Sequence, residues 1–318
     1  MPFNPEKFVE EAVKDVKEKV GDGKAIIAVS GGVDSTVAAA VVGKAIGHNL
    51  VAVHVDTGLM RKNESENVKK ALSSVVELHV INASDRFFEA LKGASEPEKK
   101  RKIIGEMFIR IFEEEAKKSG AKFLVQGTIA PDWIESGSGL RDTIKSHHNV
   151  GGLPKDMDLT LVEPLRELYK DEVRKVGAAL QLPKELYERQ PFPGPGLAVR
   201  IMGEVTPEKA GIVREACAIT EEELEKAAAD GKMELPWQYF AVVLPVKSVG
   251  VLGDARVYGV TVAVRAVDSL DGMTAKASKV PPDVLEAISD RITRKLSGKV
   301  NRVVYDVTSK PPGTIEWE

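Results

Sequence analysis

The residues best suited to chemistry lie together in one short turn, residues 30–36. The turn contains two glycines, the hydroxyls of Ser30, Ser35 and Thr36, and the carboxylate of Asp34. Glycines let backbone N–H groups approach a ligand closely, and hydroxyls donate hydrogen bonds to phosphate oxygens. A carboxylate beside them can hold a metal ion that neutralises phosphate charge. The turn therefore predicts a phosphate-binding site with Asp34 as a metal ligand.

Two apolar segments must position this turn. Residues 25–29 form a short β-branched run, which is typical of a buried parallel strand. Residues 35–46 are mostly small, which predicts a helix that packs close to a sheet. The turn would thus lead from a strand end into a helix N-terminus, whose partial positive charge also favours anions.

The exact sequence of residues 30–36 limits the class of phosphate-binding loop that the turn can form. A P-loop needs a lysine that is missing here, and the dinucleotide pattern G-x-G-x-x-G is also absent. A glycine-rich turn with ordinary capping serines is the structural alternative. The string S-G-G-x-D-S resembles the loop of the ATP pyrophosphatases, which split ATP between its α and β phosphates.

The length and composition of the chain limit the classes of protein to which it can belong. The chain has 318 residues, enough for two domains, with 43% hydrophobic residues and a net charge of −3. It has no apolar run of membrane-spanning length and no strongly basic character, and its one cysteine excludes an internal disulfide. We expect a cytoplasmic protein with no nucleic-acid and no membrane partner.

Strands and helices alternate along the first half of the chain. This order predicts an α/β fold with a doubly wound parallel sheet. Besides 25–29, the expected strands are 50–55, 75–81, 121–127 and 159–162, and besides 35–46 the expected helices are 5–20, 59–74, 98–112 and 169–182.

A proline-rich segment at 190–196 marks the expected boundary between domain 1–190 and domain 191–318. The segment is either a linker or a rigid loop that presents its backbone to a ligand. Beyond it the pattern changes, which predicts a second, smaller α+β domain. Its expected elements are two helices within 206–229, strands at 239–244, 257–267 and 300–307, and a helix at 281–296.

Several residues outside the turn at residues 30–36 allow both a structural and a functional interpretation. His54 lies inside a strand and is interpreted as a packed core histidine rather than a base. The basic run 99–102 is either a solvated helix start or the site of an anionic partner, since it opposes the helix dipole. Lys145 and His148 lie in a long polar stretch, where phosphate contact is favoured over zinc binding. The segment 308–318 is expected to dock against the protein.

Seven strings together resemble one family, the synthetase (ATP pyrophosphatase) part of GMP synthase, in the separate-subunit form typical of archaea. They are spread over residues 30–318, nearly the whole chain. The strings are SGGVDST at 30–36, KRKIIG at 100–105, QGTIAPDWIES at 126–136, KSHHNVGGLP at 145–154, QPFPGPGLAVR at 190–200, RAVDSLDGMTA at 265–275 and NRVVYDVTSKPPGTIEWE at 301–318.

This resemblance implies a reaction and its partners. ATP and Mg²⁺ would adenylate xanthosine 5′-monophosphate (XMP), pyrophosphate would leave, and ammonia would displace AMP to give GMP. The resemblance also implies that the second domain forms a homodimer and binds XMP. No glutaminase domain is recognisable, so a separate glutamine amidotransferase subunit would supply ammonia. Cys217 lacks the surroundings of a nucleophile and is expected to have a packing role.

The resemblance also suggests roles for individual residues. The ATP-binding residues would be Ser30, Gly31, Gly32, Val33, Asp34, Ser35 and Thr36, with Asp34 holding the metal. Catalytic contacts would come from Asp34, Ser30, Ser35, Lys145 and His148. The XMP pocket would include Arg101, Asp132, Glu135, Arg200, Asp254, Lys310, Ile315 and Glu316.

Two other classes could share the loop or the sheet. A tRNA-modifying pyrophosphatase would usually carry a basic face and often reactive cysteines, unlike this chain with its net charge of −3 and single cysteine. A nucleotide-binding module without enzymatic activity would have no use for a metal carboxylate or a docked tail.

Overall fold

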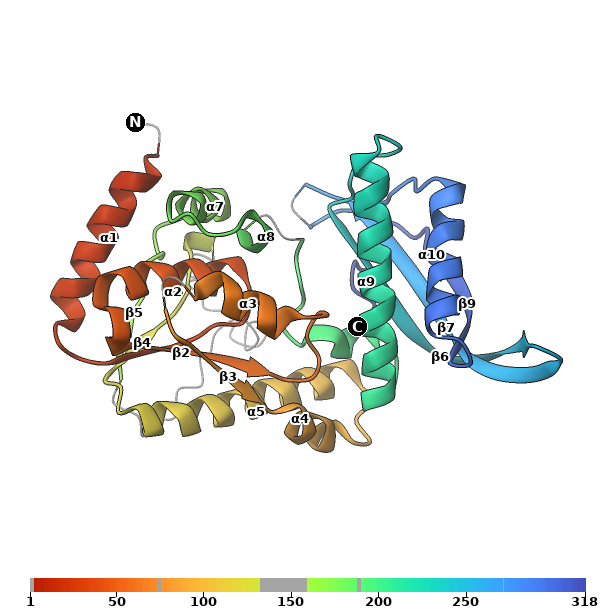
Figure 1. The fold of residues 1–318 in the computed structure, drawn as a ribbon, viewed down its shortest axis with the longest axis horizontal. Helices are drawn as coiled ribbons and strands as arrows, with labels where there is room; N and C mark the ends of the chain where they lie inside the picture. The colour runs from red at the N-terminus through yellow and green to blue at the C-terminus, as the bar shows by residue number, and fades with distance from the viewer. Residues whose placement is uncertain (1–2, 74–75, 132–158, 188–189, 271) are drawn as a thin grey trace. The chain divides into compact units, whose positions relative to one another are not determined.

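The chain forms two compact units in the computed structural model (Figure 1), which describes residues 3–73, 76–131, 159–187, 190–270 and 272–318. The second unit resumes at Gln190, next to the expected boundary, and it also includes two short earlier segments. The first unit comprises Met1–Thr57, Asn63–Ala83 and Gly105–Arg189, and the second comprises Gly58–Lys62, Ser84–Ile104 and Gln190–Glu318.

The first unit is built on a five-stranded parallel sheet with the order β3-β2-β1-β4-β5. Strand β1 (Ala25–Ala28) is central, between β2 (Leu50–Asp56) and β4 (Phe123–Val125). The outer strands are β3 (Leu78–Asn82) and β5 (Thr160–Val162). All neighbours are parallel, so the carboxyl ends of the strands meet at one edge of the sheet. The expected doubly wound parallel sheet is confirmed.

Helices cover both faces of this sheet (Figure 1). On one face, a single hydrophobic cluster contains buried residues of the sheet and of α1 (Pro5–Val20), α2 (Val33–Ile46), α3 (Glu64–Leu72) and α7 (Lys170–Ala179). Helix α2 is buried along nearly its whole length, which its small side chains permit. The other face is covered by α5 (Pro97–Ser119), whose residues from Gly105 onward belong to this unit.

Two expected elements begin later than the sequence suggests. The helix expected from residue 59 begins at Glu64, and the strand expected from residue 75 begins at Leu78. Residues 58–62 belong to the second unit, where tertiary donors bind their carbonyl groups. Leu197 N donates to Leu59 O at 2.7 Å, and Arg214 Nε donates to Met60 O at 3.1 Å. These carbonyls are therefore satisfied without a helix.

The second unit combines a mixed sheet with helices. Strands β6 (Gln238–Leu252) and β7 (Ala255–Asp268) are antiparallel, as expected, while β9 (Val300–Tyr305) pairs with β7 in parallel. The expectation of two helices within 206–229 is wrong, because α9 (Pro207–Ala229) is one continuous helix. Thr206 caps its start, and no proline interrupts its interior.

Several shorter or peripheral elements complete the described chain. None of its helices is long and apolar enough to cross a lipid bilayer. The remaining elements are η1 (Gly47–Asn49), α4 (Ser84–Leu91), α8 (Lys184–Tyr187), η2 (Gly196–Arg200), β8 (Lys276–Ala277) and α10 (Pro282–Lys295).

Candidate active site

The turn between β1 and α2 is held in shape by its own hydroxyl groups. Ser35 Oγ donates to Gly32 O at 3.2 Å and accepts from Ser30 N at 3.2 Å. Since Ser35 uses its hydrogen on Gly32, Ser30 Oγ is the donor in its 3.1 Å contact with Ser35 Oγ. The helix N-cap residue Gly32 offers no side chain to the first N–H groups of α2. Those N–H groups and the helix dipole make the turn a site for anions.

Two glycines at this turn are required by close approach. Gly31 has φ +85°, and a Cβ there would lie 2.4 Å from Glu64 Oε1. Gly127 follows β4, and a Cβ there would lie 2.9 Å from both Asp34 C and Ser35 N. The main chain after β4 thus packs directly against the start of α2. A side chain at Gly127 would displace the turn, whereas one at Gly31 would strain the backbone and displace the Glu64 carboxylate.

Asp34 is the anionic group of the turn. Its Oδ2 lies 2.5 Å from Lys170 Nζ, at the start of α7. Its Oδ1 is buried and has no hydrogen-bond partner within the described residues. Sequence reasoning missed Lys170. The order of the strands could have indicated this residue. In a parallel sheet, the chain leaves β5 at the same edge at which the β1–α2 turn lies.

The unpartnered Oδ1 of Asp34 fits a hard cation such as Mg²⁺, which prefers oxygen ligands. Thr36 Oγ1, two residues later, is likewise buried without a partner among the described residues. In the described part of the chain, no group of three or more His, Cys, Asp and Glu side chains could hold a metal. A cation bound at Asp34 would therefore rely on phosphate and water oxygens, as Mg²⁺ commonly does.

His54 packs in the core beside this turn, as the sequence interpretation predicted. It is fully buried, and its Nδ1 lies 2.7 Å from Val29 O. A carbonyl only accepts, so Nδ1 carries the hydrogen. Nε2 lies 3.1 Å from Ser65 Oγ, which donates to Asp56 Oδ2 at 3.0 Å. His54 thereby joins the end of β1 to α3 and the end of β2.

In the second unit, Arg200 and Glu316 form a two-pronged ion pair. Arg200 Nε and Nη2 donate to the two Glu316 carboxylate oxygens at 3.1 and 2.8 Å. Gln238 Nε2 donates to Glu316 Oε1 at 2.8 Å. Arg200 is buried, with its guanidinium 4.2 Å from the ring centre of Phe240. Burial alone would lower the pKa of Arg200, but Glu316 more than offsets this and raises it.

The basic run 99–102 contributes two cations to the same tail. Lys100 is fully buried, and its Nζ donates to Ile201 O at 2.7 Å and to the carboxylate of Glu318. Arg101 Nη2 donates to Glu318 O at 2.6 Å. Burial lowers the pKa of Lys100, and Glu318 partly offsets that shift. The expected docking of the tail is confirmed, and Glu318 is an anionic partner of the basic run.

Arg265 was not identified by sequence reasoning, although it begins the string at 265–275. Its guanidinium donates to Thr308 O and Thr314 O at 2.9 Å each, and to Ile315 O at 3.0 Å. Its Nη1 also lies 2.8 Å from Asp306 Oδ2. Arg265 is therefore the main anchor of the tail backbone.

The other expected pocket residues are less closely grouped. Ile315 is buried, and Lys310 Nζ donates to Gly272 O at 2.7 Å. Asp254 is exposed in the turn between β6 and β7, and Arg265 lies ten residues beyond Ala255, the first residue of β7. That separation is roughly 30 Å along a strand, so the structure does not bring Asp254 to the tail. Asp132, Glu135, Lys145 and His148 lie outside the described residues.

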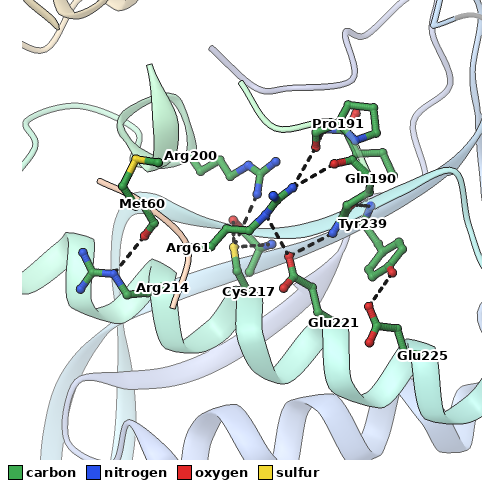
Figure 2. Close-up of polar contacts among 12 residues, drawn as sticks. Met60, Arg61, Gln190, Pro191, Arg200, Arg214, Cys217, Glu221, Glu225 and Tyr239 are labelled. Atoms are coloured by element: carbon green, nitrogen blue, oxygen red, sulfur yellow. Dashed lines mark hydrogen bonds and ion pairs between the residues drawn. The ribbon is translucent and has the colours of Figure 1, made fainter. Parts of the chain in front are cut away.

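The proline-rich segment is bound within the second unit at its first residue. Gln190 Nε2 donates to Glu221 Oε1 at 3.0 Å, and its Oε1 accepts from Tyr239 N at 2.8 Å (Figure 2). Arg61 Nη2 donates to Gln190 O at 3.0 Å. The segment is therefore held by α9, β6 and residues 58–62, which does not fit a free linker.

Comparison with known proteins identifies the family. A protein of Pyrococcus abyssi, named as a subunit of glutamine-hydrolyzing GMP synthase, is 60% identical over 318 residues, covering 99% of this chain and 100% of the relative. The chain belongs to the GMP synthase family, in its separate-subunit form. The corresponding subunit of Thermococcus kodakarensis is also 60% identical, over 98% of this chain and 99% of the relative.

A longer relative and one family model agree with this assignment, and a second model matches the first part of the chain. A GMP synthase (glutamine-hydrolyzing) of Clostridium botulinum is 58% identical over 98% of this chain, which covers 61% of that protein. The family model described as GMP synthase C terminal domain matches residues 222–317. A model described as thiamine biosynthesis protein (ThiI) matches residues 20–131. The expected family is therefore confirmed.

Cys217 has a packing role, as the sequence predicted. It is buried in α9, where Sγ accepts from Ala241 N at 3.3 Å and contacts Ala241 O at 3.4 Å (Figure 2). Burial raises the pKa of the thiol, and the neighbouring Arg200 only partly offsets this. The group is thus a buried neutral thiol at neutral pH, unsuited to nucleophilic catalysis.

We predict that Cys217 does not react with Ellman's reagent in the folded protein at pH 8. The reagent needs an accessible thiolate, and burial opposes both accessibility and ionisation. Absorbance should report no thiol in buffer and one thiol per chain in urea, since the chain has one cysteine. Rapid reaction of the folded protein would contradict the assigned packing role.

Proposed function

We propose that the chain synthesises GMP from XMP, ATP and ammonia. The observation that carries this proposal is the turn at residues 30–36, an anion site with an unpartnered carboxylate oxygen among the described residues, in a chain of the GMP synthase family. The C2 oxygen of XMP attacks the α-phosphorus of ATP, and pyrophosphate leaves. Ammonia then attacks C2, and AMP leaves with that oxygen. Atoms balance without any further reactant.

The turn suits the first of these steps. As the bond between the α-phosphorus and the bridging oxygen breaks, negative charge accumulates on the leaving pyrophosphate. N–H groups at the start of α2 and the unpartnered hydroxyl of Thr36 donate to that charge, and the turn's own hydrogen bonds hold the backbone around them. The hydroxyls of Ser30 and Ser35 donate to it by exchanging their bonds within the turn for bonds to phosphate oxygens. We place the Lys170 ammonium, 2.5 Å from Asp34, at the same phosphates. A Mg²⁺ ion held by Asp34 would neutralise phosphate charge when bound.

We place XMP against the tail, where the candidate contacts are Arg101, Asp132, Glu135, Arg200, Lys310, Ile315 and Glu316. Asp254 is left out of this group because it lies far along β7 from the tail. The bonds of Glu316 support the choice of the tail, because Arg200 and Gln238 hold its carboxylate in one orientation. A fixed carboxylate is a suitable acceptor for the N–H groups of a purine. Lys145 and His148 remain candidates for phosphate contact.

The proposed partners are a separate glutamine amidotransferase subunit and a second copy of this chain. The names of two relatives support the first, since the Pyrococcus abyssi and Thermococcus kodakarensis proteins are each called a subunit of a glutamine-hydrolyzing enzyme. With nucleotides as substrates, we place the chain in the cytoplasm. Buried Cys217 supports the need for an outside source of ammonia, because a glutaminase requires an activated nucleophile.

The β6–β7 ribbon supports the proposed homodimer. Val249 and Tyr258 are opposite each other, and Val251 lies on the same face, two residues from Val249. Their exposed fractions are 50%, 65% and 77% for Val249, Tyr258 and Val251. The ribbon extends past the pairing with β9, which starts at Val260 (Figure 1). A two-stranded ribbon with an uncovered apolar face is suited to packing against a second copy.

The decisive experiment for the proposed function supplies two nitrogen sources. The purified chain with XMP, ATP and magnesium should form GMP, AMP and pyrophosphate from ammonium, but form no GMP from glutamine alone. Cys217→Ser should retain the ammonium-dependent rate. Chromatographic measurement of GMP decides this. GMP formation from glutamine by the purified chain, lost in Cys217→Ser, would refute the need for a second subunit, and no product from ammonium would refute the function.

Asp34→Asn should lower turnover at least about 100-fold, the scale of losing one major electrostatic contact at a transition state. XMP binding, measured by calorimetry, should remain within about twofold because Asp34 serves ATP. Asp15→Asn, the same change at an exposed position of α1, should leave both unchanged. Wild-type turnover of Asp34→Asn at equal magnesium would rule out the assigned role.

Val251→Glu should dissociate the proposed dimer, because it places a charge on the exposed apolar face of the ribbon. Multi-angle light scattering should give a dimer mass for the wild type and a monomer mass for the variant. Val80→Glu, at a half-exposed position of β3 in the first unit, should remain dimeric. A dimeric Val251→Glu protein would argue against this surface.

A further inference from the structure

The tail from residue 308 onward is held by polar bonds more than by hydrophobic burial. Of residues 308–318, only Ile315 is buried, and the others are half-buried or exposed. Ordering an exposed chain costs conformational entropy at every residue. The bonds that offset this entropy cost must therefore come from donor groups that the rest of the fold already holds in place.

Arg265 is such a group. It lies within β7, is fully buried, and donates to three tail carbonyls while pairing with Asp306. Each of its three nitrogens donates to one tail carbonyl, and the ion pair with Asp306 adds a charge contact. Each hydrogen bond to a charged group contributes about 10- to 100-fold to an equilibrium. The three hydrogen bonds and the ion pair therefore outweigh the burial of Ile315 alone.

The three carbonyl groups that Arg265 binds lie close to the proposed XMP contacts. Thr308 lies two residues before Lys310, and Thr314 and Ile315 directly precede Glu316. Arg265 thus fixes the main chain shortly before Lys310 and directly before Glu316, two of the proposed XMP contacts. Asp306 strengthens the same arrangement, because its carboxylate also accepts from Thr308 N at 2.9 Å and Trp317 Nε1 at 3.0 Å.

A lysine could not reproduce this arrangement. The guanidinium presents its donors in a rigid planar fork, whereas an ammonium is a point charge on a flexible stem. The acceptors of Arg265 come from Thr308 on one side and Thr314 and Ile315 on the other. One Nζ atom cannot reach all of them with good geometry.

We propose that Arg265 is a positioning residue, which sets the conformation of residues 308–316 so that the tail recognises XMP. This inference rests on the proposed function for its substrate but not for its structural part. Arg265 itself does not touch the substrate. It acts through the backbone of the tail, while Arg200 orients the Glu316 side chain separately.

The test compares Arg265→Lys with Arg302→Lys, the same substitution at an exposed position of β9. Hydrogen exchange measured by mass spectrometry should become faster in peptides covering residues 306–318 of Arg265→Lys and should change in no other peptide. In the ammonium-dependent assay, KM for XMP should rise about 10- to 100-fold, on the scale of one lost charged hydrogen bond. KM for ATP should stay within about twofold, and Arg302→Lys should match the wild type in every measurement.

Two results would overturn the proposal. One is unchanged exchange in the tail, and the other is an equal loss for XMP and ATP together with a lower melting temperature, which indicates a general structural role. If Arg265→Lys does not fold, Asp306→Asn tests the same cluster, with about a threefold to tenfold rise in KM for XMP expected and an unchanged KM counting against the proposal. If the wild type does not use XMP, the proposed function fails, and the exchange result still decides the role of Arg265.

Discussion

The structure of the second unit depends on two buried guanidinium groups, those of Arg200 and Arg265. A buried charge must be paired and hydrogen-bonded, or its desolvation destabilises the fold by several kcal/mol. Arg200 meets this requirement through Glu316, and Arg265 meets it through Asp306 and three tail carbonyls. Each partner lies at or beyond residue 306, so the sheet and the tail form one interdependent structure. The tail is docked because the arginines beneath it require acceptors.

The first unit meets a different constraint, the convergence of parallel strand ends. The β1–α2 turn, Gly127 after β4 and Lys170 after β5 come from separate parts of the sequence, and the strand order 3-2-1-4-5 places them at one edge. Close packing of Gly127 against the start of α2 leaves no room for a side chain. The anion site is thus assembled by sheet topology and preorganised before any ligand binds.

Glu316 is a carboxylate that such an arrangement holds in one orientation. Its two carboxylate oxygens already accept three hydrogen bonds, two of them on Oε1 from Arg200 and Gln238. A carboxylate held in this way loses little conformational freedom when a ligand binds, so more of the interaction energy is available for affinity. The same reasoning applies to the turn at residues 30–36, whose hydroxyls bind one another across the turn.

The sequence by itself determined the features that depend on local pattern. Apolar β-branched runs separated by helical segments specify the parallel sheet, and the glycines, hydroxyls and Asp34 of residues 30–36 specify an anion site. The family followed from strings spread over most of the chain, and the comparisons confirmed it. The alanines around Cys217 were enough to indicate a packing role.

Only the tertiary structure decided which distant residues meet. The sequence pattern predicts helix from residue 59, yet Leu197 and Arg214 bind carbonyls of that segment in another arrangement. Lys170 lies in none of the family strings, and the string that begins with Arg265 did not indicate its role, since both roles arise from the sheet edge and from the tail. The family resemblance assigned Asp254 to the XMP pocket, but the residue lies in the turn at the far end of the β6–β7 ribbon. Local pattern specifies the elements, whereas charge pairing and close packing between remote segments select the partners.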